Sequence, residues 1–343
     1  MKFRDLGLDP RLASKMEALG FKETFKVQEA VIPSALKGND IAVRAKTGSG
    51  KTLAFGIPLA QLVKREGRVQ AIVLTPTREL AIQIFNVLRT MSDSYIALVY
   101  GGVKYERQFE DLKKADIVVG TPGRMIDHIN RGTLKARPKF FVLDEADRML
   151  DMGFIPDVRK IMSRCPPEKV WLFSATLRGE ITRLIKGRNF QVIEVGEEMP
   201  NLEHKYIEAG RNKIDLLRRI LPKDKTLVFC NTKRMTQRLG EIFKVPMLHG
   251  DMSQAARERN LKKFRNGHNY LFATDVAARG IDIPEVGAVI NFDLPKDGKD
   301  YVHRTGRTGR AGKTGQVINM IRNDDHELFR KIAGELELDI NRL

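Results

Sequence analysis

The segment DIAVRAKTGSGKTLAFGIPLAQLV, residues 40–63, joins an apolar run to an apolar helical pattern through a glycine-rich turn. Such a turn between a strand and a helix aims successive backbone N–H groups at one point, at the positive end of the helix dipole. We therefore expect a phosphate-binding loop, in which Lys51 reaches the β and γ phosphates of a nucleotide and the Thr52 hydroxyl is a Mg²⁺ ligand. The alternative is a flexible glycine turn that carries a lysine by chance. The residues expected at the nucleotide are Ala45, Lys46, Thr47, Gly48, Ser49, Gly50, Lys51 and Thr52.

Short apolar runs recur on both sides of this segment. In the first half they occupy residues 40–45, 71–77, 97–102, 116–122, 140–146 and 170–176, and amphipathic segments such as 78–91 separate them. Each run is apolar on both faces, as a parallel sheet covered by helices requires. The alternation predicts a doubly wound α/β domain.

The same pattern restarts in the second half. Residues 196–206 are polar, contain Pro200 and interrupt the alternation, so we expect a linker there. Further apolar runs follow at 226–232, 270–275, 288–293 and 316–321. The sequence thus predicts two tandem α/β domains, over residues 1–195 and 207–343.

Composition restricts the setting and the partners. The 343 residues carry a net charge of +17, spread over both halves, which favours a polyanion such as nucleic acid. Cys165 and Cys230 are isolated and match no metal-ligand spacing, which suggests a reducing compartment. With no long apolar run and no signal peptide, we expect a soluble, cytoplasmic protein that does not contact membranes.

An acidic pair ends the run at 140–146. Asp144 and Glu145 stand where a strand beside the phosphate loop would end, so Asp144 is expected to hold Mg²⁺, through water, and Glu145 to polarise the attacking water. The alternative is a solvated acidic helix start. Taken together, these residues indicate a Mg²⁺-dependent nucleoside triphosphatase, a class that includes kinases, GTPases and motors.

The order of short motifs resembles the DEAD-box RNA helicases of helicase superfamily 2. The first half contains AKTGSGKT (45–52), PTREL (76–80), GG (101–102), TPGR (121–124), DEAD (144–147) and SAT (174–176). The second half contains VFCNT (228–232), HGDMSQAAR (249–257), TDVAARGID (274–282) and HRTGRTGR (303–310). The resemblance implies two RecA-like domains, each a mostly parallel β-sheet flanked by helices, with ATP and Mg²⁺ as cofactors.

The resemblance also implies individual roles. For ATP, Gln28 reads the adenine edge, Phe3 stacks on the base and Asp282 contacts the ribose, while Arg307 and Arg310 are arginine fingers that reach the γ-phosphate when the domains meet. Coupling between ATP and RNA falls to Asp147, Ser174, Thr176 and His303. The family usually has PTPIQ where this chain has TFKVQ (24–28), a change that loosens the turn presenting Gln28.

RNA contacts are implied in the same way. They are Thr77, Arg78, Gly101, Gly102, Thr121, Arg124, Thr232, Gly250, Gln254, Arg257 and Thr274. These small residues, hydroxyls and arginines suit phosphate and sugar contacts with single strands or short duplexes, so sequence preference should be weak.

We therefore expect a monomeric ATP-dependent RNA helicase that unwinds short duplexes non-processively when its cleft closes. Two alternatives remain. One is an ATP-gated RNA clamp or chaperone with little unwinding, and the other is a DNA translocase, which shares the two-domain core. No residue names a target RNA or a protein partner.

Overall fold

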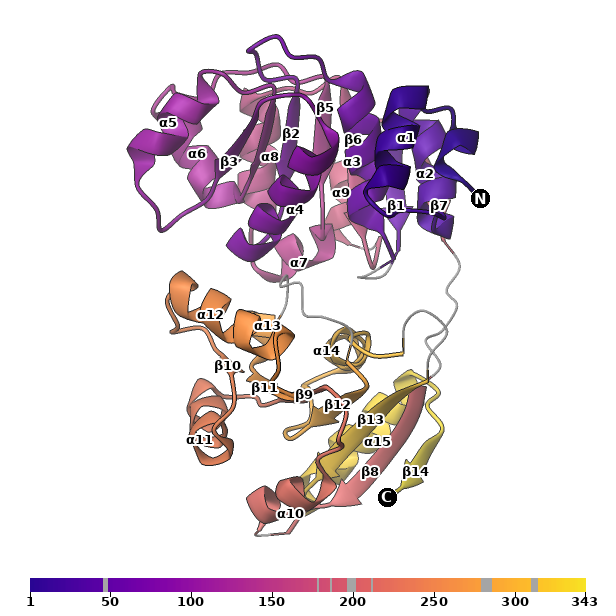
Figure 1. Cartoon of the computed structure of the whole chain (residues 1–343), viewed down its shortest axis with the longest axis vertical. Helices are drawn as coiled ribbons and strands as arrows, with labels where there is room; N and C mark the ends of the chain where they lie inside the picture. Colours follow the sequence, from indigo (N-terminus) through magenta and orange to yellow (C-terminus); the bar gives the residue numbers. More distant parts are fainter. Residues whose placement is uncertain are drawn as a thin grey trace. The chain divides into compact units, whose positions relative to one another are not determined.

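A computed structural model describes residues 1–45, 49–177, 179–185, 187–195, 202–210, 212–278, 286–309 and 314–343. The chain divides into two compact units, Met1–Glu197 and Glu198–Leu343, and each is described by itself (Figure 1). Among the described residues, no helix combines the length and the apolar character that a membrane crossing needs.

The first unit contains seven strands and nine α-helices among its described residues. In chain order, after a short 3₁₀ helix Phe3–Leu6, they are α1 Pro10–Ala18, α2 Lys26–Leu36, β1 Asp40–Arg44, α3 Lys51–Leu62, β2 Ala71–Leu74, α4 Arg78–Met91, β3 Ile96–Val99, α5 Tyr105–Leu112, β4 Ile117–Gly120, α6 Pro122–Asn130, β5 Phe140–Leu143, α7 Ala146–Asp151, α8 Ile155–Arg164, β6 Lys169–Ser174, α9 Glu180–Ile185 and β7 Phe190–Glu194.

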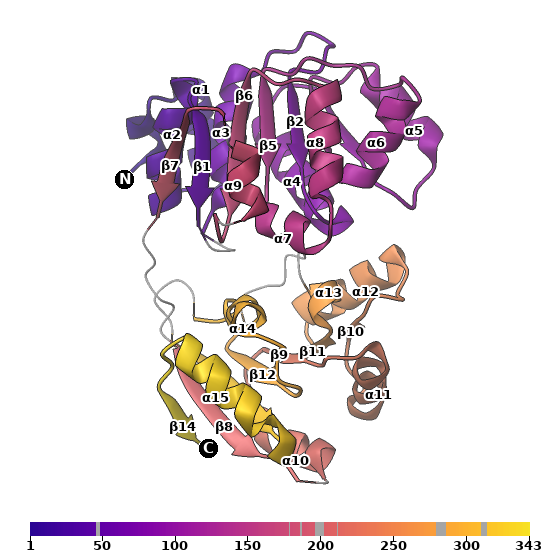
Figure 2. The ribbon, with the colours of Figure 1, turned by 180° about the vertical axis from the view of Figure 1, so that it is seen from behind.

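All strand pairs of this unit are parallel, in the order β3-β4-β2-β5-β6-β1-β7. Alternate residues of one strand enter different cores. In β2, Ala71 and Val73 pack with α2, α3 and α4, whereas Ile72 and Leu74 pack with α6, α7 and α8. The two views of the unit accordingly show α4 in front of the sheet from one side and α8 from the other (Figures 1 and 2). This burial on both faces explains why the central strands read as continuous apolar runs.

The second unit repeats this architecture. Its elements are β8 Leu202–Glu208, α10 Lys213–Ile220, β9 Thr226–Phe229, α11 Lys233–Phe243, β10 Met247–Leu248, α12 Gln254–Arg265, β11 Tyr270–Ala273, α13 Asp275–Ala278, β12 Ala288–Asn291, α14 Gly298–Thr305, β13 Gly315–Ile321, a 3₁₀ helix Asn323–Asp325, α15 His326–Glu335 and β14 Ile340–Arg342. The parallel sheet has the order β10-β11-β9-β12-β13-β8-β14. Phe229 packs with α12 and α13, and Val228 with α10 and α11.

Four strands lie outside the apolar runs recognised in the sequence: β7, β8, β10 and β14. Strand β8 begins at Leu202, inside the segment 196–206 that was expected to be a linker, and its residues LEHKYIE are mostly polar. It is a strand because it pairs along its whole length with β13, seven residue pairs from Leu202 to Glu208. The other three are short or lie at a sheet edge, where fewer side chains are buried.

Candidate active site and nucleic-acid interface

The carboxyl ends of the first sheet carry the predicted residues in two adjacent groups. Strands β5, β6 and β1 are neighbours, and they lead into the acidic pair, Ser174 and the phosphate loop. Strands β3, β4 and β2 are also neighbours, and they lead into the glycine pair at 101–102, the TPGR segment and the PTREL segment. In a parallel sheet all these ends meet at one edge, where α/β proteins bind their ligands.

The phosphate loop runs from β1 into α3. Lys51, the first residue of α3, is 7% exposed, and its Nζ donates to the carbonyl of Ala45 at 2.7 Å. Gly50 has a φ of 89°, in the left-handed region that favours glycine. Thr52 follows in the first turn of α3, and the predicted Lys46, Thr47 and Gly48 lie outside the described residues.

Gln28 of α2 lies against this loop. Its Nε2 donates to the carbonyl of Gly50 at 3.3 Å, and its Oε1 accepts from the backbone N–H of Phe25 at 3.0 Å. Phe25 is 59% exposed, an aromatic side chain beside the phosphate loop that sequence reasoning missed, although it marks the departure from the family's PTPIQ. Phe3 is 1% exposed and packs among the apolar side chains of the N-terminal helices, including Met16 and Ile32.

The acidic pair ends β5. Asp144 is buried, and one carboxylate oxygen accepts from the N–H of Glu145 at 3.0 Å. Burial raises the pKa of Asp144 to about 7; the nearby Lys51 charge opposes this increase, and Glu145 adds to it. Glu145 has a φ of 53°, and its carboxylate forms an ion pair with Arg148 at 3.1 Å. The positive charge of Lys51 and the buried carboxylate of Asp144 thus interact electrostatically beside the loop that is expected to bind phosphate.

Asp147 and the SAT segment are joined directly. The N–H of Asp147 donates to Ser174 Oγ at 3.2 Å, and the N–H of Ala175 donates to Asp147 Oδ2 at 3.2 Å. Ser174 Oγ also accepts from the N–H of Thr176 at 3.3 Å. The predicted coupling residues of the first unit are therefore in direct contact.

The second group surrounds the turn after β3. Thr77 and Thr121 are the N-cap residues of α4 and α6. The guanidinium of Arg78 packs on Gly101 and Gly102, which leave no room for a β-carbon without moving Arg78. Arg124 Nη1 donates to the carbonyl of Val103 at 3.2 Å. Two arginines and two glycines thus meet at one backbone turn, which suits contacts to a phosphate backbone.

The second unit shows a corresponding group. Thr232, Gly250 and Thr274 follow β9, β10 and β11, three neighbouring strands, and Arg257 Nη2 donates to the carbonyl of Gly250 at 2.8 Å. Helix α12 begins at the predicted Gln254, whose side chain lies outside the described part of the structure. His303 belongs to α14 and Arg307 to the turn after it; Asp282 and Arg310 are not among the described residues.

Arg304, left without a role by the sequence, is buried at 1% exposure. It makes five hydrogen bonds, to Asp275, Asn231, Asn291 and the carbonyl of Asp293. These partners come from α13, from the last residue of β12 and from the segments after β9 and β12, so Arg304 connects α14 to the strand ends. The charge of an arginine inside a glycine-rich basic segment does not reveal such burial.

The fold and this site define a nucleoside triphosphatase built from two RecA-like units. The DEAD/DEAH box helicase family matches residues 25–184, and the helicase conserved C-terminal domain matches residues 212–312. A probable ATP-dependent RNA helicase of Methanocaldococcus jannaschii is 42% identical over 100% of this chain and 98% of its own length. The DbpA ATP-dependent RNA helicase of Bacillus subtilis is 41% identical over 99% of this chain and 76% of its own length.

A solved structure of an RNA-bound protein is also similar to this chain. The Dbp5 protein of S. cerevisiae bound to RNA and ADP BeF3 is 30% identical and covers 100% of this chain and 95% of its own, with a TM-score of 0.89. The chain belongs to the DEAD-box ATP-dependent RNA helicases.

Proposed function

We propose that this protein couples ATP hydrolysis to RNA binding and to local, non-processive separation of short duplexes. The observation that carries the proposal is that the predicted residues at the carboxyl ends of the first sheet fall into two groups. The phosphate-binding group follows β1, β5 and β6, and the arginine and glycine group follows β2, β3 and β4. ATP and RNA would then be bound side by side on one rigid sheet.

The residues present fit a Mg²⁺ ion with the nucleotide. The Thr52 hydroxyl and the Asp144 carboxylate are hard oxygen donors, which Mg²⁺ prefers, and a cation would stabilise the charged form of the buried Asp144. Mg²⁺, when bound, neutralises charge on the phosphates. Lys51 exchanges its bond to Ala45 for the β and γ phosphates, and Glu145 polarises the attacking water.

The second domain completes the ATP site when the domains close on RNA. Arg307 and Arg310 then reach the γ-phosphate and Asp282 the ribose, while Gln28 reads the base. Closure is transmitted through Asp147, Ser174 and Thr176 on one side and His303 on the other. The hydrogen bonds that already join Asp147 to the SAT segment support this route.

We propose domain limits of 1–195 and, in place of 207–343, 202–343, because strand β8 pairs with β13 and therefore belongs to the second domain. The buried, free thiols of Cys165 and Cys230 fit a reducing compartment, so we propose a cytoplasmic location.

ATP turnover with and without RNA tests the proposal, with Arg307→Ala as the main variant. An arginine finger contributes about 10³–10⁵ in rate, so the variant should lose RNA-stimulated turnover and keep ATP binding. Arg219→Ala on α10 is the matched control, because it removes the same charge from an exposed position. Unchanged turnover in Arg307→Ala means that the finger assignment is wrong.

Two further measurements separate the alternatives. Stimulation by DNA as strong as by RNA identifies a translocase of broader specificity. RNA-stimulated turnover without displacement of a short duplex identifies an ATP-gated clamp.

A further inference from the structure

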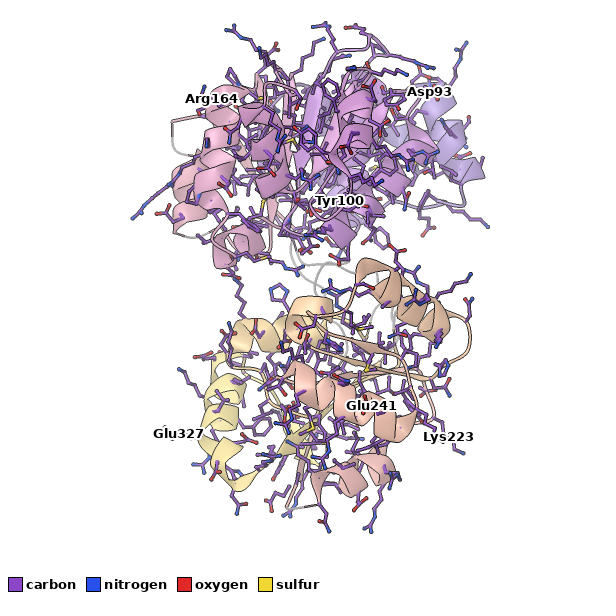
Figure 3. The ribbon with its side chains drawn as sticks, turned by 90° about the vertical axis from the view of Figure 1, so that its left-hand side faces the viewer. Asp93, Tyr100, Arg164, Lys223, Glu241 and Glu327 are labelled. Atoms are coloured by element: carbon purple, nitrogen blue, oxygen red, sulfur yellow. The ribbon has the colours of Figure 1, made fainter. Side chains whose placement is uncertain are left out.

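Gln108 occupies an unusual place in the first unit. It belongs to α5 and is 3% exposed, so water satisfies neither end of its amide. Its Nε2 donates to the carbonyl of Tyr100 at 3.0 Å. Tyr100 immediately precedes the glycine pair at 101–102, and it lies at the end of the unit opposite Asp93 and Arg164 (Figure 3).

The turn after β3 is therefore held from three directions. Arg78 packs on its glycines, Arg124 donates to Val103, and Gln108 donates to Tyr100. Arg78 and Arg124 are proposed RNA contacts, so RNA competes with the turn for their guanidinium groups. Gln108 is buried, so we expect its bond to the Tyr100 carbonyl to face no competition from RNA.

A second layer fixes which way the Gln108 amide points. Its Oε1 lies 3.3 Å from Nε2 of His128, a fully buried residue of α6. Because Gln108 Nε2 donates to Tyr100, Oε1 must accept, and His128 must carry its hydrogen on Nε2. His128 Nδ1 then faces the Thr133 hydroxyl at 2.8 Å.

Tyr105 contacts both His128 and Thr133. Its ring stacks on His128, with centroids 4.2 Å apart, and its hydroxyl lies 3.0 Å from Thr133 Oγ1. Arg131 covers the ring at 4.6 Å, so the ring is not a free platform for a base. Burial first, and then the positive charges of Arg124 and Arg131, lower the pKa of His128 to about 4, against the opposing charge of Asp127. The guanidinium groups of Arg124 and Arg131 both lie near the Tyr105 ring that stacks on His128.

We propose that Gln108, oriented by its contact with His128, is a positioning residue that sets the Gly101–Gly102 turn for contact with the RNA backbone. This inference rests on the proposed function of that turn. The hydrogen bond from Gln108 fixes the position of the Tyr100 carbonyl. The backbone of the two glycines that follow is thereby kept between Arg78 and Arg124. Loss of the donor lets the turn relax and weakens RNA binding, whereas the ATP group on β1, β5 and β6 is unaffected.

The test measures the RNA concentration that gives half-maximal ATP turnover. Gln108→Met removes both hydrogen bonds at similar volume, and Gln108→Glu keeps the acceptor toward His128 but removes the donor toward Tyr100. Both should raise the half-saturating RNA concentration about tenfold, the effect expected of one buried hydrogen bond. The KM for ATP and the turnover at saturating RNA should stay within about twofold of the parent, as the separate sites require.

Gln70→Met is the matched control. Gln70 is 1% exposed and its Nε2 also donates to a loop carbonyl, that of Lys64, at 2.6 Å. Gln70 directly precedes β2, so it lies at the amino end of the parallel strands, whereas Tyr100 follows β3 at their carboxyl end. Its loss should lower the melting temperature by a similar amount and leave RNA affinity unchanged.

The outcomes are distinct. If the Gln108 variants lose thermal stability like Gln70→Met but bind RNA like the parent, Gln108 has only a structural role and the inference is wrong. If Gln108→Met does not fold, Gln108→Glu decides by the same criterion. If RNA fails to stimulate even the parent, while the variants fold normally, the proposed function fails first.

Discussion

Replacement of Gly50 by alanine should damage the ATP site in a way that the structure allows to be calculated. Gly50 has a φ of +89°, and a β-carbon there would lie 2.6 Å from Gln28 Nε2 and 2.9 Å from Phe25 Cδ2. The left-handed backbone costs about 1 kcal/mol with alanine. Displacing the buried Gln28 amide breaks two hydrogen bonds, to Phe25 and Gly50, at about 1 kcal/mol each. The free energy of unfolding should therefore fall by about 3 kcal/mol.

Gly38→Ala is the matched control. Gly38 has a φ of +76°, and no atom lies within 4 Å of a β-carbon placed there. This variant should lose only the backbone part, about 1 kcal/mol. For a unit of this size, thermal unfolding should show decreases of about 9 °C for Gly50→Ala and about 3 °C for Gly38→Ala. The KM for ATP should rise at least about tenfold in Gly50→Ala alone, because Gln28 and the loop move together and a loss of about 1.4 kcal/mol in binding is tenfold in affinity.

A double variant makes the reasoning refutable. Adding Gln28→Ala to Gly50→Ala removes the nearer of the two side chains that the new methyl group meets, so the two costs should be strongly non-additive. Additive losses, or equal melting temperatures for Gly50→Ala and Gly38→Ala, would show that Gln28 does not limit the space at Gly50.

Three further predictions follow from buried charges. Arg304→Lys should lower the free energy of unfolding of the second unit by about 3 kcal/mol, because lysine cannot replace five hydrogen bonds; a loss below about 1 kcal/mol in urea contradicts this. Burial lowers the pKa of His128 to about 4, so the unfolded chain binds the proton at a higher pH than the folded protein does. The free energy of unfolding should therefore fall by up to about 3 kcal/mol between pH 6.5 and pH 4. His128→Gln should flatten that pH dependence. The raised pKa of Asp144 makes its charge unfavourable in the folded protein. Asp144→Asn should therefore stabilise the Mg²⁺-free protein by up to about 4 kcal/mol at pH 8, less as the pH falls toward 4, and abolish ATP turnover.

Local patterns in the sequence were enough to predict that the proposed nucleotide-binding residues follow strands. The loop at 45–52 and the acidic pair at 144–145 follow buried strands, and apolar runs of this kind are visible without a structure. Strand β8 was not visible because its polar residues gain their pairing from β13, more than a hundred residues away. Periodicity reports which faces of one element are buried, and it carries no information about a distant partner strand.

The sequence by itself determined the two α/β domains, the phosphate loop and the order of the motifs, since each depends on neighbouring residues in the chain. Only the tertiary structure decided the strand order, and with it the separation of the phosphate group on β1, β5 and β6 from the arginine and glycine group on β2, β3 and β4. It also decided that Arg304 and Gln108 are buried and hydrogen-bonded to several elements. The physical reason is that a polar side chain is buried only where partners from several elements converge on it, and that convergence exists only in the folded chain.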